Sequence, residues 1–209
     1  MQRLLDQIGR TPRLTVINLL KRSQGLTVRE LAAKLDMSYM GVKQICLDLE
    51  KDGFLDTFRR HRGIGRPELL YRLTDKANAL FPQADNSMAL SMLDQARKLY
   101  GSGAAEKMLF LHFQEKTEEY AANAKGETLE SRVRSLAKLR DREGYTADLV
   151  EENPPLQVIE RHHPMQPLLE AYPNAVNLER DMIQKVLGAP VRFEQAGTGA
   201  AWERRIIVG

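Results

Sequence analysis

Basic residues are concentrated in one short stretch of the sequence. Between Thr57 and Pro67 the chain has no Asp or Glu, but it has four arginines and one histidine: Arg59, Arg60, His61, Arg62 and Arg66. Gly63 and Gly65 lack side chains, so the backbone there can approach another chain closely. Guanidinium groups bind phosphates and enter narrow minor grooves. The stretch therefore predicts a contact with a nucleic-acid backbone; the alternative is a solubilising loop, which would more often mix charges of both signs.

A second candidate contact surface lies upstream, on a helix predicted to start after Ser38. Its apolar residues recur at helical spacing and define an inward face: Val42, Ile45, Cys46 and Leu49. On the outward face, a glutamine can pair with adenine, a lysine can bind guanine or phosphate, and an apolar side chain can contact a thymine methyl group. We predict DNA contacts from Ser38, Tyr39, Met40, Lys43 and Gln44, with Leu47 further along. The alternative is an ordinary solvated helix face.

Helix start and stop signals place this surface in a helix-turn-helix. Thr27 and Glu30 have the spacing of a capping box, which predicts a short helix directly after them. Ser38 can cap the second helix through its hydroxyl group. Gly53 can end that helix in a left-handed conformation, which glycine adopts without steric cost.

Two extended runs, 54–58 and 69–73, flank the basic stretch and predict a hairpin with the arginines at its tip. A further helix is expected to begin at Pro12. Residues 1–75 carry 14 Lys+Arg and 9 Asp+Glu, a net charge of +5, whereas the remaining residues carry 17 and 19, a net charge of −2. The basic part of the chain is thus the helix-turn-helix part, as DNA binding requires. We predict a winged helix-turn-helix DNA-binding domain over residues 1–82.

Chain length, cysteine content and missing motifs exclude several classes of protein. A chain of 209 residues can form one or two domains with hydrophobic cores. Its single cysteine excludes an intramolecular disulfide and suits a reducing cytoplasm. The first residues do not form a signal peptide, and no apolar run approaches the ~20 residues needed to cross a bilayer. No phosphate-binding loop, HExxH or nucleophile-elbow motif occurs. We expect a cytoplasmic protein that is neither an enzyme nor bound to a membrane.

Residues 83–143 are predicted to be helical throughout, with helices over 87–100, 104–125 and 128–142. The middle helix has an apolar face at helical spacing, formed by Phe110, Phe113, Thr117, Tyr120 and Ala124. Helices of this length need a partner surface to cover such faces. We predict a helical dimerisation segment and a homodimer, since helix-turn-helix proteins usually read two half-sites. The alternative is that these helices pack on the C-terminal part of the same chain.

Residues 144–209 alternate between extended and helical patterns. Extended runs are expected over 145–150 and 156–159, then a helix over 175–187, then extended runs over 191–194 and 202–208. The order predicts a small antiparallel sheet with helices on one face. The fold class of the whole chain is therefore α+β, with this last segment as an effector or sensor domain.

Several motifs together resemble a known family. They are Ser38-x-x-Gly-Val-Lys43, Leu49-Glu-Lys-Asp-Gly53, Gly65-Arg-Pro67 and Tyr71-x-Leu-Thr74, followed in the C-terminal part by His162-His-Pro164, Glu179-Arg180 and Val186-Leu-Gly188. This set resembles the ArsR-like winged-helix repressors of iron–sulfur cluster assembly (SufR-like). The resemblance implies a homodimeric bacterial transcription regulator with a sensing C-terminal domain.

The sequence departs from that family where the cofactor would bind. Family members hold an iron–sulfur cluster with cysteines in the C-terminal domain, and the first of these positions corresponds to His163. The only thiol, Cys46, belongs to the inward face of the predicted recognition helix. Because a cluster needs several thiolate ligands, we expect no cluster and no other cofactor. For His162 and His163, a turn role is favoured over metal binding because adjacent residues on a strand point to opposite faces.

The sequence thus predicts a DNA-binding transcription regulator, a repressor that binds an inverted repeat as a homodimer. Its C-terminal domain is expected to sense an unknown small-molecule effector. The expected effector-binding residues are Tyr145, His163, Phe193 and Trp202, although a plain core role suits the aromatic ones equally. The alternative function is a protein-interaction module in which the winged helix contacts protein.

Overall fold

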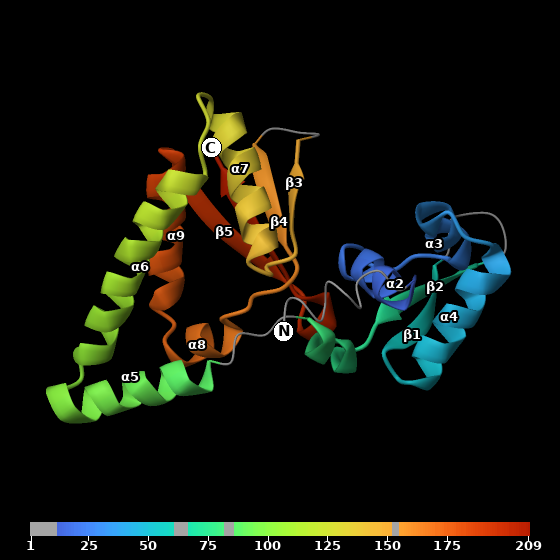
Figure 1. Cartoon of the computed structure of the whole chain (residues 1–209), viewed down its shortest axis with the longest axis horizontal. Helices are drawn as coiled ribbons and strands as arrows, with labels where there is room; N and C mark the ends of the chain where they lie inside the picture. The colour runs from blue at the N-terminus through green and yellow to red at the C-terminus, as the bar shows by residue number, and fades with distance from the viewer. Residues whose placement is uncertain (1–11, 61–66, 82–85, 152–154) are drawn as a thin grey trace. The chain divides into compact units, whose positions relative to one another are not determined.

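The computed structural model describes residues 12–60, 67–81, 86–151 and 155–209. The chain divides into two compact units. The N-terminal unit comprises Met1–Pro82 together with Ala196–Trp202. The C-terminal unit comprises Gln83–Gln195 and Glu203–Gly209. Figure 1 shows the elements of both units.

The N-terminal unit is a winged helix-turn-helix. Its elements are α2 (Pro12–Lys21), α3 (Val28–Leu35), α4 (Tyr39–Lys51), β1 (Leu55–Arg60), β2 (Glu68–Leu73) and a 3₁₀ helix (Asp75–Leu80). One hydrophobic core joins them, and it includes Val16, Leu31, Val42, Leu49 and Leu55. The predicted fold of this part of the chain is confirmed.

The turn between α3 and α4 is fixed by side chains at both of its ends. The Thr27 hydroxyl accepts a hydrogen bond from the Glu30 backbone N–H (3.2 Å), and the Glu30 carboxylate accepts one from the Thr27 N–H (2.7 Å). This is the predicted capping box. Asp36 ends α3 in the left-handed region (φ 51°), and Ser38 caps α4 by accepting from the Gly41 N–H (3.1 Å). These local bonds set the direction in which α4 leaves the turn.

The wing is a two-stranded antiparallel hairpin. β1 and β2 pair from Leu55 opposite Leu73 to Arg60 opposite Glu68. Gly53, with φ 78°, allows the chain to turn from α4 into β1. Residues 61–66, which include the predicted contacts Arg62 and Arg66, lie outside the described residues.

The C-terminal unit combines helices with a four-stranded sheet. The helices are α5 (Ser87–Tyr100), α6 (Ala104–Asn123), α7 (Leu129–Arg142), α8 (Gln166–Ala171) and α9 (Ala175–Leu187). The strands β3 (Ala147–Val150), β4 (Leu156–Glu160), β5 (Val191–Ala196) and β6 (Glu203–Val208) have the order β3-β4-β6-β5, with β4 antiparallel to β3 and to β6. The predicted α+β class is confirmed. The short helix α8 was not predicted from the sequence.

The helical segment and the C-terminal sheet share one core. α7 packs on β3 and β4, and α6 runs beside α9, as Figure 1 shows. Phe113, Tyr120 and Ala124 of the predicted apolar face lie in this core, while Phe110 stays about half exposed. The inner faces of α6 and α7 are thus covered by their own chain, which was the alternative to a second subunit. Periodicity reveals that a helix face is buried, but not which surface buries it.

None of the helices in the described ranges combines the length and the apolar character that a membrane-spanning segment would need.

Candidate DNA-binding surface and C-terminal cavity

The recognition helix α4 exposes the side chains that were predicted to read DNA. Tyr39 is 50% and Met40 69% exposed, and Lys43 and Gln44 are also exposed. Val42, Cys46 and Leu49, on the other face, are buried in the core of the N-terminal unit. Ser38 differs from the other predicted contacts because its hydroxyl already caps the helix.

Gln44 has a partner that DNA could replace. Its amide Nε2 donates to the Asp48 carboxylate at 2.9 Å, one helical turn along. Because this bond is exposed to solvent, exchanging it for bonds to a base edge costs little. The arrangement also holds the glutamine on the outer side of α4.

The described part of the wing contributes two of the four predicted arginines. Arg59 is exposed, whereas Arg60 pairs with Glu68 across the hairpin (3.3 Å). The Arg60 Nε is buried and has no hydrogen-bond partner among the described residues. A second cross-strand pair, Arg72 with Asp56 (2.8 Å), lies on the same hairpin. Arg59 is therefore the wing cation in the described ranges that is best placed to meet a phosphate.

Cys46 is a core residue of the N-terminal unit. Its side chain is fully buried, and burial, reinforced by the charge of Glu50, raises the pKa of the thiol to about 11. The sulfur is therefore protonated at neutral pH. A protonated, enclosed thiol is a poor nucleophile, so Cys46 acts here as a core side chain.

The C-terminal unit contains a buried network of two arginines and two glutamates. Arg140 of α7 donates to Glu160 (2.5 Å) and to Glu179 (2.7 Å). Arg204 of β6 donates to the same two carboxylates, at 2.9 and 2.5 Å to Glu160 and at 2.7 Å to Glu179. All four side chains are almost completely buried. Burial opposes ionisation of Glu179, but Arg204 and Arg140 outweigh it and hold the pKa of Glu179 well below its usual value.

His163 joins this network as a neutral side chain. Its Nδ1 accepts the Met165 backbone N–H (3.2 Å), so the proton lies on Nε2, which donates to Glu179 at 3.2 Å. Burial lowers the pKa of His163, although Glu179 acts in the opposite direction. The network therefore has two positive and two negative charges and is neutral as a whole.

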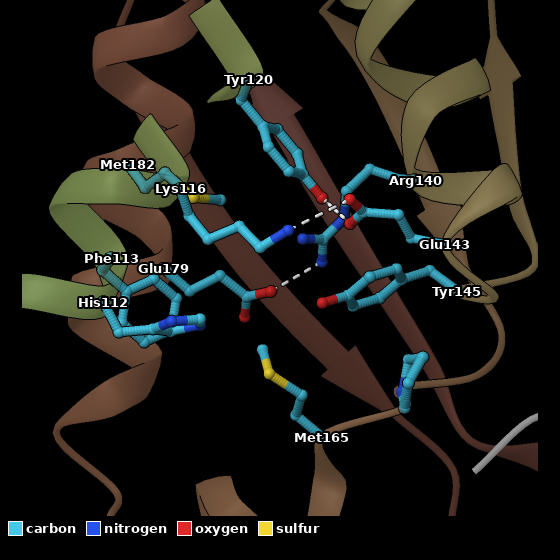
Figure 2. Close-up of a pocket in the computed structure, with 11 residues that line it drawn as sticks. His112, Phe113, Lys116, Tyr120, Arg140, Glu143, Tyr145, Met165, Glu179 and Met182 are labelled. Atoms are coloured by element: carbon cyan, nitrogen blue, oxygen red, sulfur yellow. Dashed lines mark hydrogen bonds and ion pairs between the residues drawn. The ribbon is translucent and has the colours of Figure 1, made fainter. Parts of the chain in front are cut away.

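A cavity of about 290 Å³ lies beside the network, between α6, α9, the end of α7 and the loop before α8. Figure 2 shows its lining side chains. The Tyr120 hydroxyl donates to the Glu143 carboxylate, and Lys116 pairs with the same carboxylate at 3.5 Å. Arg140 stacks on the Tyr145 ring, 3.4 Å from its centroid.

The structure brings together two of the four predicted effector-binding residues. Tyr145 lines the cavity, and His163 packs edge-on against its ring, with 4.9 Å between the ring centroids. Phe193 instead stacks on Arg204 (4.5 Å) and lines a separate surface hollow. Trp202 is partly buried and belongs to the N-terminal unit.

Sequence reasoning missed most of the network and the cavity, although a signal was present. Arg140 follows Val133 and Leu136 at core spacing along α7, and Glu179 falls between Ala175 and Met182 on the buried face of α9. A charged residue at a core position is a candidate for a buried ion pair. The partners of Arg140 and Glu179, however, come from elements that are distant in the sequence, so no local pattern predicts the pairs.

The residues around His163 do not fit an iron–sulfur cluster. The single cysteine of the chain, Cys46, lies in the core of the N-terminal unit, so the C-terminal unit supplies no thiolate. Across the described ranges, no group of three or more His, Cys, Asp or Glu side chains is arranged to hold a metal ion. His163 itself belongs to the ion network, where it is bonded to Glu179.

Comparison with known proteins identifies the N-terminal part of the chain. Residues 10–56 match the family described as winged helix-turn-helix DNA-binding. The matched residues include α2, the helix-turn-helix and the start of the wing. No curated protein and no solved structure matches the chain. The protein therefore has a winged helix-turn-helix DNA-binding domain, which indicates a role in transcription regulation.

Proposed function

We propose that the protein is a homodimeric transcription regulator that represses genes by occupying an inverted-repeat operator. The observation that supports this most directly is α4: its inner face is buried, and its outer face presents Tyr39, Met40, Lys43 and Gln44. Two such helices in a symmetric dimer read half-sites about 34 Å apart. In this proposal Arg59, Arg62 and Arg66 bind phosphates beside each half-site, while α4 reads the bases.

Exposed apolar side chains on α5 and α6 support the dimer. Met88, Met92 and Leu99 form one stripe along α5, and Leu99 and Tyr100 are 72% and 81% exposed. The first half of α6 adds Met108, Phe110 and Leu111 on its outer side, while Leu109 and Phe113 fill its inner side. Exposed apolar side chains gathered on one surface are typical of an interaction site. A second copy of this surface would cover it symmetrically.

The C-terminal unit would then sense an effector without an iron–sulfur cluster. The residues at the family's cluster position form a closed ion network instead, and the adjacent cavity offers room for a ligand. Under this proposal the fold of the sensing domain is retained while its cofactor is absent. Repression would be relieved or strengthened when the cavity is occupied.

Matched substitutions should separate phosphate contacts from base reading. Arg59→Ala should weaken binding to every DNA sequence and lower the log–log salt slope by about 0.9 for one lost phosphate contact. Gln44→Ala should leave that slope unchanged but relax preference at one base pair, at a cost of about 1–3 kcal/mol. Fluorescence anisotropy at several salt concentrations measures both effects.

The control is Arg192→Ala, which removes the same charge from an exposed position on β5 of the C-terminal unit. We expect wild-type affinity and salt slope for this variant. Equal effects of Arg59→Ala and Arg192→Ala would contradict the assignment of the wing. If α4 and the wing bound protein rather than DNA, none of the three variants would change DNA binding.

A further inference from the structure

Two hydrogen-bonding groups at the C-terminal cavity lack partners among the described residues. The Tyr145 side chain is buried, yet its hydroxyl forms no hydrogen bond with any described residue. Figure 2 shows this hydroxyl pointing into the space beside Glu179 and Met165. Arg140 uses Nε and Nη2 in the ion network, which leaves its Nη1 without a partner among the described residues. Neither atom is among the solvent-excluded side-chain atoms of the described residues that lack a partner, so both are accessible from the cavity and can form hydrogen bonds with a ligand there.

The position of Tyr145 is fixed independently of any ligand. Its ring is held between the Arg140 guanidinium, 3.4 Å from the ring centroid, and the edge of His163. Burial raises the pKa of Tyr145, so the hydroxyl stays protonated and can donate a hydrogen bond. The site is therefore preorganised, which reduces the entropy lost on binding.

The rest of the cavity is mainly apolar. Phe113, Met165 and Met182 supply much of its wall, and methionine side chains adapt to ligands of different shape. An apolar cavity of about 150 Å³ accommodates benzene. A volume of about 290 Å³ therefore suits a ligand of roughly a dozen non-hydrogen atoms.

Each lysine, arginine and glutamate that lines the cavity already has an ion-pair partner. Lys116 pairs with Glu119 (2.9 Å) and Glu143 (3.5 Å) on one side, and Arg140 pairs with Glu179 on the other. Behind them, Arg204 and Glu160 also pair. A charged ligand would therefore bring a buried charge without a free counterion, which is costly. An uncharged ligand carries no such penalty.

We propose that this cavity binds an uncharged, mostly apolar small molecule that carries one hydroxyl, carbonyl or amide oxygen. That oxygen accepts hydrogen bonds from the Tyr145 hydroxyl and Arg140 Nη1, while the apolar body contacts Phe113, Met165 and Met182. Binding itself is independent of DNA; only the identification of the ligand as a regulatory effector rests on the proposed function.

Four probes with one phenylpropyl body test this proposal: 3-phenylpropanol, 3-phenylpropanamide, 3-phenylpropanoate and 3-phenylpropylamine. The first two are neutral, the third is an anion and the fourth a cation at neutral pH. Isothermal titration calorimetry on the full chain without DNA should show binding of the alcohol and the amide. The two charged probes should bind at least about tenfold more weakly, which corresponds to one uncompensated charge costing 1.4 kcal/mol or more.

Tyr145→Phe should weaken binding of the alcohol by roughly two- to tenfold, because one hydrogen bond is lost. The matched control is Tyr172→Phe, which removes a hydroxyl from a partly buried tyrosine of the same unit that does not line the cavity. It should bind like the wild type. The proposal is overturned if neither neutral probe binds at millimolar concentration, if the charged probes bind as tightly, or if the two variants behave alike. Each of these results leaves the DNA-binding measurements above unaffected, so failure here is distinguishable from failure of the regulator.

Discussion

Replacing Glu179 with glutamine should lower the free energy of unfolding by about 3–5 kcal/mol. Glu179 accepts bonds from Arg140, Arg204 and His163, and its side chain is inaccessible to solvent. Without its charge, the two arginines face Glu160 alone, and one positive charge stays buried without compensation. Glutamine has the same shape, so the loss reports charge pairing rather than packing. Urea denaturation followed by circular dichroism measures the change.

Asp181→Asn is the matched control for Glu179→Gln. Asp181 lies two residues further along α9, is exposed, and pairs only with the neighbouring Arg180 (3.1 Å) among the described residues. Its substitution should change stability by no more than about 0.5 kcal/mol. Combining Glu179→Gln with Arg204→Met should cost less than the sum of the two single changes, because removing one arginine restores neutrality. Additive losses would contradict a coupled network.

Placing aspartates at Met92 and Phe110 should convert the proposed dimer into a folded monomer. Both side chains are exposed on the apolar surface of α5 and α6, so in the monomer the new charges stay in water. In a dimer interface they would be buried without partners, which is strongly unfavourable. Because two linked recognition helices bind DNA far more tightly than one, affinity for a two-half-site operator should fall by about 10²- to 10⁴-fold.

Sedimentation velocity and DNA titration together test the dimer. Ala122→Asp, an exposed position near the C-terminal end of α6, adds one negative charge on the same helix away from Phe110 and should leave both the dimer and the affinity unchanged. A wild-type chain that sediments as a monomer at micromolar concentration would contradict the proposed interface. So would an unchanged sedimentation coefficient for the double aspartate variant.

Local signals in the sequence predicted the N-terminal unit in detail. The capping box at Thr27, the Ser38 cap and the left-handed Gly53 are interactions between residues at most a few positions apart. Such interactions are encoded by residue type and spacing, so the boundaries of α3 and α4 follow from them. The observed bounds of α5 and α9 also equal the predicted ones, although neither helix has a side-chain cap at its start.

Contacts between distant residues were less accessible to prediction. Tyr120 and Phe113 were expected to face a second subunit, yet they pack within their own chain, because an apolar stripe does not specify its partner. The ion network links Arg140 to residues 20 and 39 positions away along the chain. Only the fold brings these charges together, and the cavity beside them has no sequence signature of its own.

The central claim is that this chain reads DNA sequence as a dimer, and selection of bound DNA from a random pool tests it most directly. The purified wild-type protein should enrich an inverted repeat whose half-sites are centred about one helical turn apart, near 34 Å. Its affinity for that repeat should exceed its affinity for unrelated DNA by about 10³-fold or more at physiological salt. Recovery of a pool without any common motif, bound no more tightly than unrelated DNA, would contradict the account.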